Sequence, residues 1–179
     1  MRLFHVSEEP DITEFVPRIP HRQDLDRTKG LVWALNERCL PNFLTPRNCP
    51  RVTYHATDKS TPEDIARFFS SQSRHTVAIE NAWYEQMAKA VLYIYEFDTS
   101  NFYRQNSNFK LQDDIAGYYV SEKTEIPISV TRYDDLFGEL FKRDVEVRIL
   151  SSLWELGDAV QQSTLNWSLC RMAYAQPRL

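Results

Sequence analysis

The chain has 179 residues, of which 42% are hydrophobic and 13% aromatic, and it carries a formal net charge of −4. This length and apolar content predict a single globular domain, residues 1–179, with a hydrophobic core of its own. The acidic balance argues against a dedicated nucleic-acid-binding protein, which usually carries a basic excess. No apolar run approaches the roughly 20 residues that cross a bilayer, so we expect a cytoplasmic protein without a membrane partner.

Glycine, cysteine and histidine are too sparse or too scattered for the common cofactor motifs. The four glycines, at positions 30, 117, 138 and 157, form no Gly-rich phosphate loop, which excludes dinucleotide binding of the Rossmann type. The three cysteines make no C-x-x-C pair and the four histidines show no zinc-binding spacing, so no metal is expected. Cys49 lies between Arg47 and Arg51, whose charge could lower its thiol pKa, but with no general base in view a structural role is favoured.

In chain order, short patterns rich in β-branched and aromatic residues alternate irregularly with short amphipathic ones. Strands are expected at residues 3–7, 30–35, 51–56, 76–80, 90–97, 116–121, 126–131 and 145–149. Helices are expected from Thr61, over 81–90, and from Ser152 to about residue 162. A further helix is expected to be capped by Asp134 and to bury Leu136, Phe137, Leu140 and Phe141. Strands outnumber helices, so the class is α+β with a curved, mainly antiparallel sheet and flanking helices.

Three connecting segments are distinctive. Residues 8–29 are rich in proline but carry Phe15 and other apolar side chains, which favours an ordered crossover. Residues 99–113 are polar and typical of a surface excursion. Residues 164–179 are too aromatic for a disordered end, so we expect a C-terminal tail that docks on the domain and buries Trp167.

His5 interrupts the apolar first strand, and strand alternation places it on the same face as Leu3 and Ser7. The imidazole and the hydroxyl are therefore candidates for one polar site. The alternatives are a hydrogen-bonded core histidine and a serine that caps the turn before Pro10. Trp33, in the second strand, is either a stacking platform or an ordinary core aromatic.

A polar ring in the first strand followed by an aromatic in the second resembles the ADP-ribosyltransferase fold. That resemblance implies a split, curved sheet, NAD as a substrate, and transfer of ADP-ribose to a nucleic acid, nucleotide or protein. It also implies that His5 and Ser7 hold the nicotinamide ribose and that Trp33 or Tyr119 stacks on the ring. The string from His5 to Asp11 resembles, in addition, the opening of a family of small bacterial proteins; this second resemblance covers nearly the whole chain and implies no activity.

The same fold usually supplies a carboxylate that stabilises oxocarbenium-like charge as nicotinamide leaves. In many members a glutamate directly precedes a Tyr-(Ile/Val)-Val string. Here Tyr118 or Gly117 occupies that position, and Glu122 and Glu125 are the nearby acids. Either is a candidate for the catalytic role.

Arginines in the proline-bounded stretches form the last candidate group. They are expected to be exposed and to present planar guanidinium groups to phosphate or pyrophosphate, as in the RNA 2′-phosphotransferases of the resembling fold. The residues are Arg18, Arg22, Arg47 and Arg51. The simpler interpretation is a set of solvated loop charges.

Two functions from different classes follow. The first is an NAD-dependent ADP-ribosyltransferase, with a nucleotide-like small molecule as its partner. The second is a non-catalytic nucleotide-binding or interaction domain that retains the fold without turnover. The missing glutamate favours the second, and the histidine, the aromatics and the arginines favour a ligand site in both.

Overall fold

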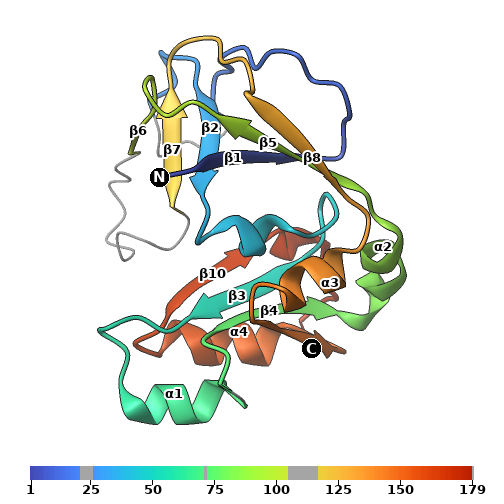
Figure 1. Cartoon of the computed structure of the whole chain (residues 1–179). Coiled ribbons are helices and arrows are strands. Elements are labelled where there is room, and N and C mark those ends of the chain that lie inside the picture. Colours follow the sequence, from blue (N-terminus) through green and yellow to red (C-terminus); the bar gives the residue numbers. More distant parts are fainter. Residues whose placement is uncertain (21–25, 71, 105–116, 179) are drawn as a thin grey trace. The chain divides into compact units, whose positions relative to one another are not determined.

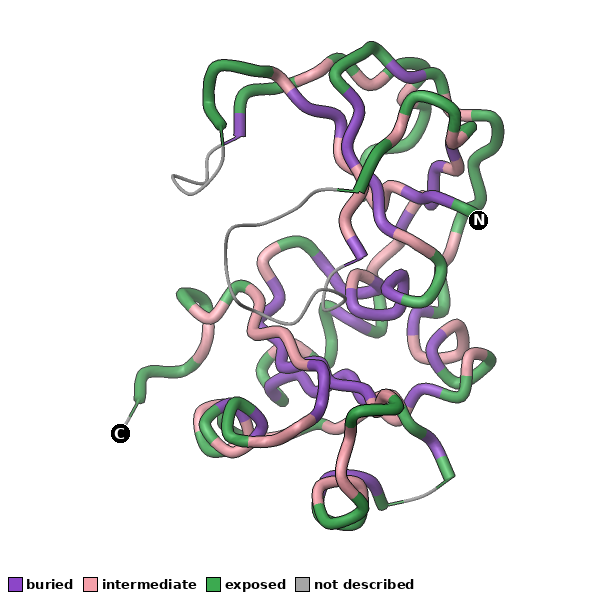
Figure 2. Tube along the Cα trace, turned by 90° about the vertical axis from the view of Figure 1, so that its left-hand side faces the viewer, coloured by how far each residue is buried: buried purple, intermediate pink, exposed green. Residues whose placement is uncertain are grey.

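The computed structural model describes residues 1–20, 26–70, 72–104 and 117–178. The chain divides into two compact units, and each is assembled from two separate stretches (Figure 1). The first unit comprises Met1–Phe43 and Leu92–Tyr133, and the second comprises Leu44–Val91 and Asp134–Leu179. In both, stretches of buried residues, drawn in purple in Figure 2, alternate along the chain with exposed ones.

The first unit is an antiparallel sheet of six strands in the order β6-β7-β2-β1-β5-β8, followed in Figure 1 from β1 (dark blue) outward. Its strands are β1 (Leu3–Ser7), β2 (Val32–Asn36), β5 (Leu92–Phe97), β6 (Tyr103–Arg104), β7 (Tyr118–Ser121) and β8 (Ser129–Tyr133), and one turn of 3-10 helix, η1 (Leu40–Phe43), completes it.

The strand register defines two faces of this sheet. His5 lies opposite Tyr95 of β5, and alternation places Leu3, His5 and Ser7 on one face, as the sequence predicted. We call it the His5 face. Leu3 also lies opposite Asn36 of β2, so the alternate β2 residues Ala34 and Val32 join the same face. The first unit's core lies here, because Leu3, Val32, Ala34 and Phe97 form its buried cluster.

The segment that follows β1 is ordered over its described residues. The backbones of Phe15 and Glu125 pair, and so do those of Arg18 and Leu31. Tyr95 fixes the start of the segment, because its hydroxyl donates to the Glu9 carbonyl at 2.7 Å and accepts from the Ile12 N–H at 3.1 Å. The predicted crossover is therefore confirmed for residues 8–20 and 26–29, whereas residues 21–25 lie outside the described part.

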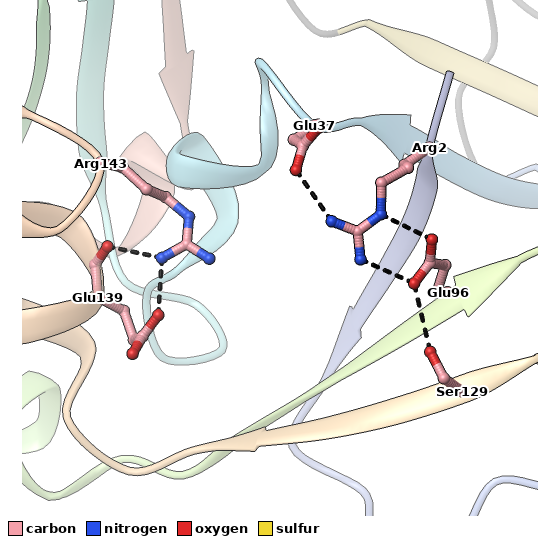
Figure 3. Close-up of polar contacts among 6 residues, drawn as sticks. All are labelled: Arg2, Glu37, Glu96, Ser129, Glu139 and Arg143. Carbon is pink, nitrogen blue, oxygen red and sulfur yellow. Dashed lines mark hydrogen bonds and ion pairs between the residues drawn. The ribbon is translucent and has the colours of Figure 1, made fainter.

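Arg2, directly before β1, forms ion pairs with acids on or next to the two strands that flank β1 (Figure 3). Its guanidinium binds both carboxylate oxygens of Glu96 on β5, at 2.8 and 2.9 Å, and reaches Glu37 after β2 at 3.1 Å. Ser129 of β8 donates to the same Glu96 carboxylate at 3.3 Å. A bidentate contact of this kind is more directional than an ordinary surface pair. Figure 3 also shows a separate contact of the second unit, in which Arg143 binds Glu139 one turn earlier.

The second unit is a sheet of four strands in the order β10-β3-β4-β9, in which β4 and β9 are parallel and the other pairs antiparallel. The strands are β3 (Arg51–His55), β4 (His75–Glu80), β9 (Val145–Leu150) and β10 (Asn166–Cys170). The helices are α1 (Pro62–Phe68), η2 (Asn81–Trp83), α2 (Tyr84–Lys89), α3 (Leu136–Phe141), α4 (Trp154–Gln161) and η3 (Met172–Tyr174).

Local chemistry explains where α1 begins. The Thr61 hydroxyl accepts from the Asp64 N–H, and Pro62 takes the first helical position, where a missing N–H costs nothing. The core of this unit lies on one face of the sheet. There Phe68 of α1 and Val160 of α4 pack against Val52 and Tyr54 of β3.

The mainly antiparallel α+β class is confirmed, but the strands form two sheets, whereas one curved sheet was expected. The other differences from prediction are local. The predicted tail docks as an additional strand, β10, although Trp167 is only half-buried. The strand predicted at 126–131 begins at Ser129, because Pro127 has no N–H for the ladder. Asp135, not Asp134, caps α3, and Phe141 is 60% exposed instead of buried. Among the described residues no helix has the length and apolar character that a membrane span needs.

Candidate functional site

His5 is the centre of the candidate site in the first unit. Its Nδ1 atom lies 3.0 Å from the carbonyl oxygen of Trp33. A carbonyl only accepts, so Nδ1 carries the hydrogen and donates. Burial lowers the pKa of His5 below its ordinary 6.5. The hydrogen bond to Trp33 raises this pKa but is the smaller effect, and the Arg18 charge lowers it further. The ring is therefore neutral at pH 7, and its Nε2 presents a lone pair.

Phe15 connects His5 with one of the candidate acids. Its ring centroid lies 4.8 Å from that of His5, and its edge-on contacts with Tyr95 and Phe97 fix the ring in place. The Phe15 backbone exchanges two hydrogen bonds with Glu125, of 2.8 and 3.0 Å. Phe15 thus contacts the His5 side chain through its ring and the Glu125 backbone through its own backbone.

The two candidate acids differ in their surroundings. Glu125 is 6% exposed and accepts a hydrogen bond from the buried Ser121 hydroxyl. Glu122 is exposed and is held by Lys29 at 3.0 Å and by the Tyr103 hydroxyl at 2.9 Å. Its hydrogen bonds from these two groups lower the Glu122 pKa. Glu125 is therefore the sequestered carboxylate, and Glu122 is a solvated one.

The aromatic candidates lie on opposite faces of the sheet. Tyr119 faces Ala34 across the β2–β7 ladder, which places it on the His5 face, where it packs against the core. Trp33 faces Val120 instead, and its ring packs in a T-shaped contact with that of Tyr118, with the ring centroids 5.3 Å apart. Of the two aromatic residues expected to stack on a ligand that His5 holds, Tyr119 therefore shares the His5 face and Trp33 does not, because adjacent residues of a strand point to opposite faces.

Ser7 shares the face of His5 but has a local role. Its hydroxyl accepts from the N–H of Glu9 at 3.0 Å, which is the turn-capping alternative that the sequence left open.

The arginines do not form the predicted cluster within either unit. Arg18 belongs to the first unit and is exposed, whereas Arg47 and Arg51 belong to the second. The expectation that Arg51 is exposed in a loop is wrong: it begins β3, is 7% exposed, and donates from Nη1 to the Cys49 carbonyl at 3.1 Å. Arg22 lies outside the described residues.

Cys49 is not an activated thiol. Burial raises its pKa to about 12, and the neighbouring Arg51 charge, which acts in the opposite direction, is too weak to reverse this. The possibility that flanking arginines activate Cys49 is therefore contradicted. Within the described residues, no group of three or more metal-ligating side chains comes together.

Sequence reasoning missed two contributors to the site, Phe15 and Ser121. Phe15 was visible only as an apolar residue in a proline-rich segment, and nothing local indicated that it pairs with Glu125. Ser121 closes the Gly117–Ser121 strand pattern, and its spacing of four residues from Glu125 gives no strand or helix signal.

The fold and this site define a mixed α+β protein with a neutral strand histidine and a buried carboxylate joined through one aromatic residue. Residues 4–175 match the model of the DUF6886 family, which is described as a family of unknown function. The match spans most of the chain, so the protein belongs to that family. No curated protein and no solved structure matches the chain.

Proposed function

We propose that this protein is an NAD-binding ADP-ribosyltransferase-like protein with its site on the His5 face of the first unit. The observation that carries the proposal is the pairing of Glu125, a buried carboxylate, with the segment that holds the His5 ring. A sequestered carboxylate is the group that stabilises positive charge when nicotinamide leaves. The finer assignment of the antiparallel sheet to a split ADP-ribosyltransferase-like sheet is part of this proposal.

The residues take distinct roles. The neutral His5 accepts a hydrogen bond from a ribose hydroxyl at Nε2, because Nδ1 is engaged with the Trp33 carbonyl. Tyr119 is the stacking platform, since Trp33 lies on the other face. Glu125 stabilises the charge that develops on the ribose carbon as the bond to the nicotinamide nitrogen breaks. The bonding electron pair leaves with nicotinamide, and water or an acceptor adds to that carbon and loses a proton.

One observation favours the alternative, a nucleotide-binding domain without turnover. Glu125 already accepts a hydrogen bond from Ser121, and the Phe15 ring lies against His5. A catalytic site requires that NAD displace or share these contacts, whereas a binding domain leaves the carboxylate where it is.

Calorimetry with NAD and a nicotinamide-release assay test the proposal. In Glu125→Gln the amide keeps an oxygen for Ser121, so we expect NAD binding to persist while release falls about 100-fold or more. Glu122→Gln is the matched control on an exposed acid and should leave release unchanged. In His5→Asn the amide N–H replaces Nδ1–H but Nε2 is lost, so NAD affinity should fall roughly tenfold, the weight of one hydrogen bond.

The outcomes separate the two functions. NAD binding without release in the unaltered chain supports the binding domain. If calorimetry detects no heat of binding at millimolar NAD, both functions are refuted, because even a binding free energy of about −4 kcal/mol is detectable at that concentration. Loss of release in Glu122→Gln but not in Glu125→Gln contradicts the assignment of the acid.

A further inference from the structure

One face of the second unit's sheet is polar where β3 meets β10. Three directly opposed pairs lie on it: Arg51 with Cys170, Thr53 with Ser168, and His55 with Asn166. Alternation places all six on one side, which we call the Thr53 face. The opposite side carries Val52 and Tyr54 and packs into the apolar core. A sheet normally buries apolar residues, so this row requires a separate explanation.

The Thr53 face carries no carboxylate in any of its four strands. From β4 the register adds His75, Val77 and Ile79, and from β9 it adds Val145, Val147 and Ile149. Glu80 and Glu146, the acids of these two strands, alternate to the other side. Guanidinium, hydroxyl and amide groups without an acid form a set of donors that suits an anion.

Thr53 supplies the second, independent observation. Its side chain is 1% exposed, and its hydroxyl has no hydrogen-bond partner among the described residues. Leaving a buried hydroxyl unsatisfied is costly, so buried polar groups in folded proteins nearly always have a partner. An orphaned donor in the middle of a row of donors indicates a missing acceptor.

The neighbours of Thr53 are held in place. Asn166 Nδ2 lies 3.4 Å from His55 Nε2, and the His55 ring packs on that of His75 with centroids 5.3 Å apart. The buried Arg51 places a fixed positive charge at the other end of β3. β10 is the edge strand of the sheet, and its Ser168 and Cys170 are half-exposed.

We propose that the Thr53 face is an oxyanion site that binds a phosphate group, with Thr53 and Ser168 as hydroxyl donors, His55 and Asn166 at one end, and Arg51 at the other. Phosphate fits because its several oxygens accept donors arranged in a row, and the absence of acids avoids repulsion. The β10 edge, where Ser168 is half-exposed, is the route of entry. All five of these residues belong to the second unit, so phosphate binding is tested separately from NAD binding by the first.

Calorimetry at constant ionic strength tests the site with two probes, inorganic phosphate and adenosine monophosphate, against a chloride blank. We expect saturable binding, with shifts of the His55 imidazole signals in NMR spectra at the same concentrations. Tighter binding of adenosine monophosphate identifies a nucleotide phosphate, and equal or weaker binding identifies the free anion. Both results support a phosphate site.

Thr53→Val keeps the shape of the side chain and removes its hydroxyl. Binding should weaken about tenfold, as for one hydrogen bond to a charged group. Thr76→Val is the matched control, because the Thr76 hydroxyl is equally buried and equally without a partner among the described residues, but it points to the apolar core side, away from the row of donors. Ser168→Ala, on the half-exposed edge strand, provides a second test should Thr53→Val fold poorly, and it should also weaken binding.

Two results overturn the proposal. The first is the absence of saturable phosphate binding at 50 mM, roughly an upper limit for a useful site of about −2 kcal/mol. The second is binding that neither Thr53→Val nor Ser168→Ala weakens more than Thr76→Val does, which places the anion elsewhere.

Discussion

At the scale of single residues, His5 shows how strand geometry determines a side chain's chemistry. The Nδ1 hydrogen bond to the Trp33 carbonyl fixes the tautomer, and burial keeps the ring neutral. A neutral imidazole with an available lone pair can accept from a hydroxyl, whereas a charged one could only donate. The core-histidine interpretation and the ligand-binding interpretation therefore share one geometry, and they differ in what approaches Nε2.

The lowered pKa of His5 predicts a pH dependence of stability. The unfolded chain takes up a proton near pH 6.5, whereas the folded chain resists protonation until the pH is lower. The stabilising contribution is therefore complete above pH 6.5 and is lost as the pH falls below it. Urea unfolding at pH 7.5 and 5.5 should show a smaller loss for His5→Asn, which keeps the donor to Trp33 but does not titrate. Equal losses in the two chains would contradict this.

At the scale of elements, the strands and capped helices could be predicted because their signals are local. The Thr61-Pro62 start of α1 and the apolar run of β5 depend on neighbours in the chain. Pairing partners could not be predicted, because they depend on residues far away in sequence. Phe15 meets Glu125, and the C-terminal segment becomes β10 by joining β3. The assignment of Trp33 to the His5 site failed because it also depended on pairing. The sequence pattern predicted its strand correctly, but the register with β7 determines which face its side chain occupies.

The docking of β10 has a measurable energetic consequence. Leu165, directly before β10, is completely buried in the core of the second unit. Leu165→Ala should lower the free energy of unfolding by about 2–5 kcal/mol, the range for a leucine whose removal leaves a cavity. Phe141→Ala is the control, because Phe141 is 60% exposed and its truncation should cost about 0.5 kcal/mol or less. Similar losses in the two variants, measured by urea unfolding, would show that β10 packs loosely.

At the scale of the whole molecule, the sequence order and the spatial grouping do not coincide. The chain leaves the first unit after Phe43, returns at Leu92, and leaves again after Tyr133. The central strand β1 pairs with β2 from its own stretch and with β5 from the later one. Likewise β3 pairs with β4 and with β10, whose sequences lie far apart. Neither sheet is therefore encoded by a continuous piece of the chain.

This arrangement predicts how the chain responds to division. A fragment of residues 1–91 contains β1 and β3 but lacks β5 and β10, and a fragment of residues 92–179 contains only the complementary strands. Each fragment leaves strand edges and apolar faces uncovered, so neither should unfold cooperatively by circular dichroism. An equimolar mixture supplies both stretches of each unit and should recover the sheet signal, whereas doubling the concentration of either fragment alone should not. Cooperative unfolding of one isolated fragment would show that a single stretch is enough to form a sheet, contrary to the pairing of β1 with β5 and of β3 with β10.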